Sequence, residues 1–181
     1  PDKFLLISIF GSSPEDFQRV AGKLSRFADG FELNMSCPHA KGYGQEIGKD
    51  PAVARQYLAA VKAATDKPAL CKLSPNVGDL QPLVSALIEE GADGFTVINT
   101  VGPIEHKHEI TGTAALSNGV GGTSGPFVKS EALRCVRQTR AAIRDSGKQL
   151  PVLGMGGIAT VEDVVDFEEA GADFFGIGTS L

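Results

Sequence analysis

The chain has 181 residues, of which 42% are hydrophobic, and this is enough for one sizeable core. Its formal net charge is −5, and because it has no basic run, the sequence does not favour a nucleic-acid partner. It has no apolar stretch of about 20 residues and no signal-peptide pattern, so we expect a cytoplasmic protein without membrane contact. The three cysteines are far apart and odd in number, which favours reduced thiols over disulfides or an iron–sulfur site.

Apolar, branched runs alternate with amphipathic stretches along the chain. A strand over 4–10 leads to a helix capped by Ser13, with Pro14 first and Phe27 on its inner face. Strand 31–36 precedes a helix that begins at Asp50. Strand 69–75 precedes a helix that ends at Gly91, and strand 94–100 precedes a helix over 126–146. Strand 151–157 precedes a helix capped by Thr160, with Val161, Val164 and Val165 inward, and strand 173–179 comes last.

One short repeat marks the return from helix to strand: Ala28-Asp29-Gly30-Phe31, Ala92-Asp93-Gly94-Phe95 and Ala172-Asp173-Phe174-Phe175. Such a succession predicts an α/β fold with a parallel sheet. A (β/α)8 TIM-type barrel needs eight strands and typically about 250 residues. We therefore predict a single incomplete barrel domain over residues 1–181, represented by about six strands, with the first two strands and the last helix missing. An open doubly wound sheet fits the length but does not explain why every strand ends in polar or glycine-rich residues.

Chemistry in a parallel barrel gathers at the carboxyl ends of its strands. Here those ends carry amides, a thiol, an ammonium group and bare backbone, with no carboxylate and no metal-ligand spacing: Asn34, Ser36, Cys37, Lys72, Ser74, Asn99 and Thr100. Amides suit a planar heterocycle, and an inward lysine suits a cofactor that acquires negative charge. A buried amide such as Asn99 also often braces backbone instead. Cys71 and Cys135 lie within apolar patterns and are expected in the core, and residues 106–108 are expected in a solvated loop.

Glycine clusters follow the last two strands, at 154–158 and 176–180, and a third lies at 121–126. Backbone N–H groups freed by glycine at a helix start can cradle a phosphate, and barrels usually bind phosphate here. The plainer interpretation is that these turns only close the loops between strands and helices.

Six segments, in this order and spacing, resemble the flavin-dependent dihydroorotate dehydrogenases of the cysteine-using class: "ELNMSCP", "KLSPNVGDL", "GADGFTVINT", "GGTSGPFVKSEALR", "LGMGGIATVEDVVDFEEAGAD" and "GIGT". The resemblance covers essentially the whole chain, with a poorer stretch at 101–120. It implies an FMN-binding (β/α)8 barrel that oxidises dihydroorotate to orotate in pyrimidine biosynthesis.

The resemblance also implies a role for particular residues. Cys37 would be the base that removes a proton from the substrate, in a loop that closes over the site. Asn34, Asn99, Thr100 and His39 would contact the pyrimidine. The FMN-binding residues would be Lys72, Ile98, Ser124, Gly125, Gly156, Gly157, Gly178 and Thr179. No metal is implied.

The histidine at position 39 leaves two alternatives for the identity of the substrate. The orotate-forming enzymes usually have asparagine after Ser-Cys-Pro, whereas the related dihydropyrimidine dehydrogenases, which reduce uracil and thymine, have histidine there but follow it with a longer loop. An inactive partial barrel that binds no flavin is a third alternative. The sequence does not identify the electron acceptor, which is fumarate, NAD through a separate electron-transfer subunit, or a quinone. The resemblance implies a homodimer, the usual state of the family.

Overall fold

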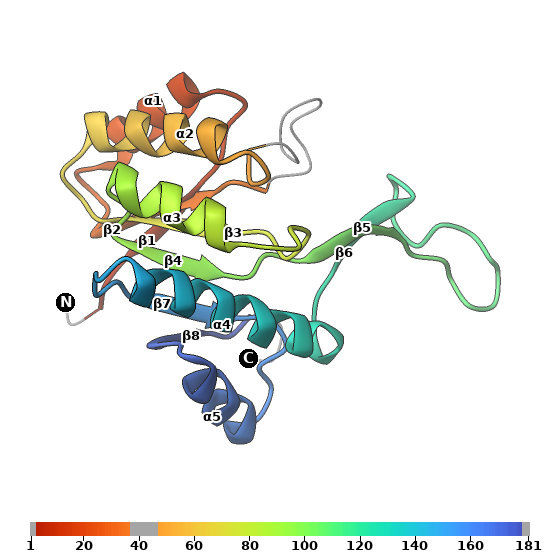
Figure 1. Ribbon diagram of the computed structural model, residues 1–181. Coiled ribbons are helices and arrows are strands. Elements are labelled where there is room, and N and C mark those ends of the chain that lie inside the picture. Colours follow the sequence, from red (N-terminus) through yellow and green to blue (C-terminus); the bar gives the residue numbers. More distant parts are fainter. Residues whose placement is uncertain (1–2, 37–46, 179–181) are drawn as a thin grey trace.

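The computed structural model describes residues 3–36 and 47–178, and these form one curled parallel sheet with helices along its outer face (Figure 1). The strands of this sheet are β1 (Leu6–Ile9), β2 (Gly30–Asn34), β3 (Ala69–Leu73), β4 (Gly94–Val97), β7 (Val152–Met155) and β8 (Phe174–Gly176). The helices are α1 (Pro14–Leu24), α2 (Pro51–Ala64), α3 (Gln81–Glu90), α4 (Lys129–Asp145) and α5 (Val161–Ala170). A 3₁₀ turn, η1 (Pro126–Val128), leads into α4.

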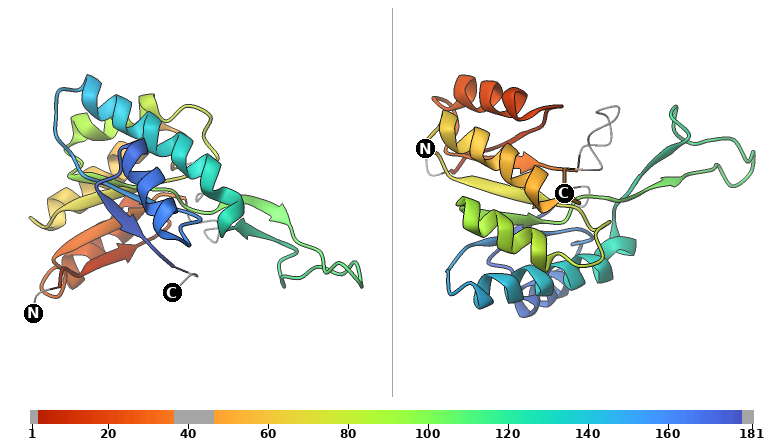
Figure 2. Two further views of the ribbon diagram at one scale, coloured as in Figure 1. Left: turned by 90° about the horizontal axis from the view of Figure 1, so that it is seen from below. Right: turned by 45° about the horizontal axis from the view of Figure 1, so that its top comes forward.

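The strands lie side by side in the order in which they occur along the chain, β1-β2-β3-β4-β7-β8. Each helix packs against the next one, from α1 on α2 through to α4 on α5. A doubly wound sheet would instead reverse its strand order and place helices on both faces. The curled, singly wound arrangement is clear in both views of Figure 2, and it confirms the predicted barrel type over the alternative.

Local sequence signals account for the helix boundaries. The Ser13 side chain accepts the N–H of Asp16 at the start of α1, and Asp50 accepts from Ala52 and Val53 at the start of α2. Thr160 and Asp163 form a reciprocal capping box at the start of α5. Helices α3 and α5 end at glycines with positive φ, 96° at Gly91 and 107° at Gly171.

The core lies between the sheet and the helices. Alternate strand residues point to it, so Phe31 and Leu33 of β2 and Phe95 and Val97 of β4 are fully buried. Helix α2 contributes Tyr57, Leu58 and Val61 to the same layer, together with α3. Residues between these strand positions face the inside of the curled sheet instead, which is where the candidate site lies.

For two helices, the prediction of which residues face the core is wrong in part. Phe27 follows the end of α1 and is 56% exposed. In α5, Val164 packs against the core, but Val161 and Val165 are 74% and 46% exposed. These two valines are four residues apart and so share one face of the helix, while Phe167 and Ala170 cover the sheet from the other face.

The segment between β4 and α4 forms a hairpin where the sequence indicated only loops. Strands β5 (Val101–Glu105) and β6 (Val120–Thr123) pair antiparallel and project from the carboxyl end of the sheet (Figure 1). Lys107, within the expected loop, pairs with Glu105 on the surface, and His108 is exposed, whereas His106 is half-buried. Within residues 3–36 and 47–178, no helix is long and apolar enough to cross a bilayer.

Candidate active site

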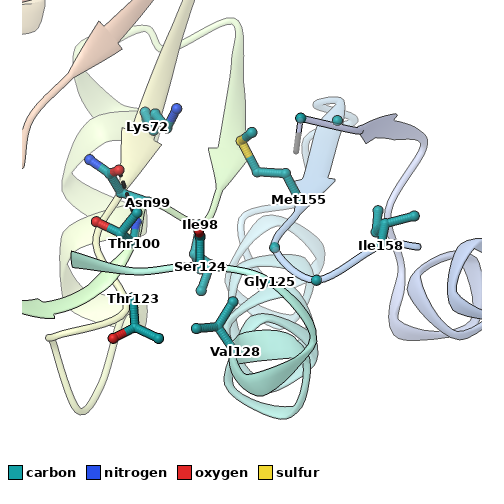
Figure 3. Close-up of a pocket in the computed structure, with 14 residues that line it drawn as sticks. Lys72, Ile98, Asn99, Thr100, Thr123, Ser124, Gly125, Val128, Met155 and Ile158 are labelled. Carbon is teal, nitrogen blue, oxygen red and sulfur yellow. Dashed lines mark hydrogen bonds between the residues drawn. The ribbon is translucent and has the colours of Figure 1, made fainter. Parts of the chain in front are cut away.

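A pocket lies at the carboxyl ends of the central strands, and most of the predicted site residues of the described chain line it (Figure 3). Its walls come from the strand β3, the segment after β4, the strand β6, the turn before α4, the end of β7 with the loop after it, and the end of β8 with the residues after it: Lys72, Ile98, Asn99, Thr100, Thr123, Ser124, Gly125, Val128, Met155, Gly156, Gly157, Ile158, Gly176 and Gly178. The pocket measures about 180 Å³. Small-molecule pockets usually measure about 300–1,000 Å³, so this one can enclose only part of a cofactor-sized ligand.

Two amides and a hydroxyl group meet at the ends of β2 and β4. Asn99 Nδ2 donates to Asn34 Oδ1 at 3.1 Å and to Ser36 Oγ at 2.5 Å. Asn34 Oδ1 also accepts the Ser36 N–H at 3.2 Å, so the carbonyl end of Asn34 is occupied. The NH₂ end of Asn34 is therefore the part that can donate to a ligand.

Asn99 has a structural role on its other side. Its Oδ1 accepts the N–H of Thr100 at 2.9 Å, so this amide braces the adjoining backbone as well as Asn34. Figure 3 shows Asn99 and Thr100 on the same wall of the pocket as Lys72, opposite Met155 and Ile158. The structure thus brings together the residues that the sequence placed at separate strand ends.

Lys72 reaches the pocket from β3, and a carboxylate that the sequence analysis missed holds it there. Its Nζ lies 3.3 Å from Oε1 of Glu32 on β2. The same Oε1 accepts from Ser8 Oγ of β1 at 2.8 Å. Glu32 lies two residues before Asn34, so strand alternation alone places both on the inner face. That signal was available, but Glu32 sits in the middle of an apolar strand and not at its end.

Three glycines of the pocket wall have backbone conformations that L-residues rarely adopt: φ is 85° at Gly125, 120° at Gly156 and 82° at Gly157. A Cβ on Gly157 would lie 2.7 Å from the Gly125 carbonyl oxygen, and one on Gly156 would lie 3.2 Å from Ala132. A Cβ on Gly125 or Gly178 would meet no atom within 4 Å. Gly156 and Gly157 therefore pack two loops closely, while Gly125 and Gly178 border open space.

An ion cluster lies behind these glycine loops. Lys129, at the start of α4, pairs with Asp163 and Asp166 of α5. Asp163 also accepts the N–H groups of Ala159 and Thr160, each at 2.8 Å. The Lys129 side chain, followed by these two N–H groups, holds the pKa of the Asp163 carboxyl well below its usual value. Hydrogen bonds to Asp163 and Asp166 raise the pKa of Lys129 in turn.

The two described cysteines belong to the core, as predicted. Burial raises the pKa of the Cys71 thiol far above its usual value and that of Cys135 to about 11. Neither thiol is therefore ionised at neutral pH. Cys37, His39 and Thr179 lie outside the described residues. Within the described ranges, no group of three His, Cys, Asp or Glu side chains could hold a metal ion.

A family model for dihydroorotate dehydrogenase matches residues 2–181 of this chain. The chain belongs to the dihydroorotate dehydrogenase family. The catalytic subunit of dihydroorotate dehydrogenase B (NAD(+)) from Pyrococcus abyssi is 47% identical over 181 residues, which cover 98% of this chain and 57% of that protein. The subunit of the same name from Listeria innocua is 38% identical over 177 residues, which cover 97% and 56%. The chain thus spans little more than half the length of these relatives.

A solved structure shows the same fold. The structure described as DHODH in complex with ferulenol, from Eimeria tenella, superposes with a TM-score of 0.74 at 22% identity, over 92% of this chain and 48% of that one. At this identity the likeness concerns the fold alone. It agrees with the singly wound sheet of this chain, a segment of a TIM-type barrel.

Proposed function

We propose that the protein containing this chain is an FMN-dependent enzyme that oxidises dihydroorotate to orotate. Family membership is the observation that carries the proposal, because the relatives that cover nearly all of this chain are named as catalytic subunits of this activity. His39 alone favours a uracil-type substrate, and the relatives' names outweigh that single residue.

The pocket suits the phosphate end of FMN. Gly125 and Gly178 leave space in which backbone can approach a phosphate, and Ser124 lies in the same wall. Ser124, Gly125, Gly156, Gly157, Gly178 and Thr179 would hold the ribityl phosphate, and Ile98 and Lys72 would contact the ring system. When bound, FMN supplies a hydride acceptor, and the ammonium of Lys72 would stabilise negative charge at the N1–C2 carbonyl edge.

The remaining roles fall to groups around the ring of the substrate. The Asn34 NH₂ group would donate to a pyrimidine carbonyl from beside the pocket wall that Asn99 and Thr100 form. The Cys37 thiolate would take the proton from the carbon next to the one that loses hydride. His39 would lie near the substrate carboxylate. These assignments rest on the resemblance and on the placement of the described partners.

The relatives' names include NAD(+) and the word "catalytic", so we infer a separate subunit that passes electrons to NAD. A small pyrimidine would be the substrate, and a homodimer of this chain remains part of the proposal.

The test is anaerobic reduction of the purified protein. It should carry a flavin absorbance spectrum that bleaches on addition of dihydroorotate and not of dihydrouracil. Bleaching by dihydrouracil alone would indicate a dihydropyrimidine dehydrogenase. A colourless protein that takes up no added FMN would indicate the third alternative, an inactive partial barrel.

A further inference from the structure

Glu32 is a buried carboxylate that the proposed chemistry does not use. Only 7% of the residue is exposed, and it lies on the inner face of β2, between Ser8 on β1 and Lys72 on β3. Taking a carboxylate out of water is unfavourable unless a charge or hydrogen bonds compensate for it. An apolar side chain would fill this interior without that cost, so packing alone does not explain Glu32.

Glu32 sits behind Lys72 as seen from the pocket. Lys72 lines the pocket, whereas Glu32 is not among its lining residues. An ammonium group has three N–H donors, and among the described residues Lys72 gives one of them to Glu32. Two donors remain for a ligand in the pocket. Glu32 can therefore affect that ligand only by holding Lys72 or by the electric field of its own charge.

Ser8 strengthens this arrangement. Its hydroxyl donates to the same Oε1 that accepts from Lys72, so Glu32 is held from the β1 side while it holds Lys72 on the β3 side. Ser8 faces Glu32 in the β1–β2 register, and Lys72 faces Asn34 in the β2–β3 register. The sheet register thus fixes where the ammonium can lie.

We propose that Glu32 is a positioning residue: it fixes the Lys72 ammonium in the pocket wall and offsets part of its charge toward a bound anion. The nature of that anion, reduced FMN, rests on the proposed function. The carboxylate would then make the reduced cofactor less stable than Lys72 alone would make it, which keeps the flavin easy to reoxidise.

Two conservative variants separate the two effects. Glu32→Gln keeps an oxygen acceptor for Lys72 but removes the charge. Glu32→Asp keeps the charge but withdraws it by one methylene group, which loosens the contact. Glu90→Gln is the matched control, because Glu90 pairs with Arg55 at 2.9 Å in the outer helix layer, away from the pocket.

The first readout needs no cofactor. In the flavin-free protein, acetic anhydride labelling followed by peptide mass spectrometry gives the reactivity of each lysine. We expect Lys72 to react faster in Glu32→Asp than in the wild type, with Lys62 in the same sample unchanged. Equal Lys72 labelling in both proteins would overturn the positioning role, whether or not the protein binds FMN.

The second readout is the redox equilibrium of bound FMN, measured against reference dyes. Glu32→Gln should shift this equilibrium toward the reduced form by about tenfold, the order expected when one partly buried charge loses its opposite neighbour. Glu32→Asp and Glu90→Gln should leave it near the wild-type value. An unshifted equilibrium in Glu32→Gln would overturn the charge-balancing role. A protein that fails to bind FMN would instead contradict the proposed function, and the labelling experiment would still decide the role of Glu32.

Discussion

Asp93 and Ala69 exchange two hydrogen bonds where β3 and β4 begin. The Asp93 N–H donates to the Ala69 carbonyl oxygen at 3.1 Å, and the Ala69 N–H donates to Asp93 Oδ2 at 2.8 Å. Asp29 makes the same pair with Leu5, and Asp173 makes it with Val152. The repeated aspartate therefore extends the parallel ladder at three strand starts and satisfies a backbone N–H that would otherwise lack a partner.

This pairing predicts unequal costs for the same mutation. Asp93→Ala should lower the free energy of unfolding by about 1–3 kcal/mol, because the N–H of fully buried Ala69 would lose its acceptor. Asp29→Ala should cost less, because Leu5 is 52% exposed and water can replace the carboxylate. Urea unfolding of both variants measures the difference. Equal losses would show that burial of the partner N–H does not set the cost.

The cluster of Lys129, Asp163 and Asp166 predicts a loss of stability in acid. The pKa of Asp163 is lower in the folded chain than its ordinary value of 3.8, so its contribution is fully present above that value. The contribution declines as pH falls below about 4, because Asp163 of the unfolded chain then takes up a proton while Asp163 of the folded chain stays ionised until lower pH. Asp163→Asn should flatten this part of the stability profile, measured by urea unfolding between about pH 5 and 3. Asp66→Asn, an exposed control, should retain the wild-type slope.

The glycine loops predict two different ways of losing FMN. Gly178→Val should fold normally and lose the cofactor, because its side chain would occupy open space beside the pocket. Gly156→Val should distort the loop itself, because valine disfavours a φ of 120° and its Cβ would crowd Ala132. Flavin absorbance per protein after gel filtration is the measurement, with Gly78→Val, at an open site outside the pocket, as the control. A fully loaded Gly178→Val protein would argue against the cradle.

The base assignment predicts a kinetic defect without loss of cofactor. Cys37→Ala should bind FMN but slow its reduction by dihydroorotate about 10²–10⁴-fold, because no group would accept the substrate proton. Cys37→Ser should regain some activity at high pH, since a hydroxyl group is a much weaker acid than a thiol. Stopped-flow bleaching measures both, and Cys135→Ala serves as the control for a buried thiol. Wild-type kinetics in Cys37→Ala would reject this base.

His39 predicts a pH-dependent affinity for orotate. A protonated imidazole would attract the orotate carboxylate, so binding should tighten below about pH 6.5, the ordinary histidine pKa. His39→Asn should keep a hydrogen bond and lose the pH dependence. Titration of orotate against the flavin spectrum, with both proteins over the same pH range, gives the two profiles. If orotate bound at no pH, the dihydroorotate substrate would be wrong.

The sequence by itself determined the order of strands and helices, the helix caps at Ser13 and Thr160, and the strand ends that carry Lys72 and Asn99. These features depend on neighbouring residues, whose spacing is written in the chain. Only the tertiary structure decided that Glu32 holds Lys72, that Asn99 bonds to Asn34, and that residues 101–123 form a hairpin. Such contacts join residues tens of positions apart, and which of them meet depends on strand register and sheet curvature, which no local pattern specifies.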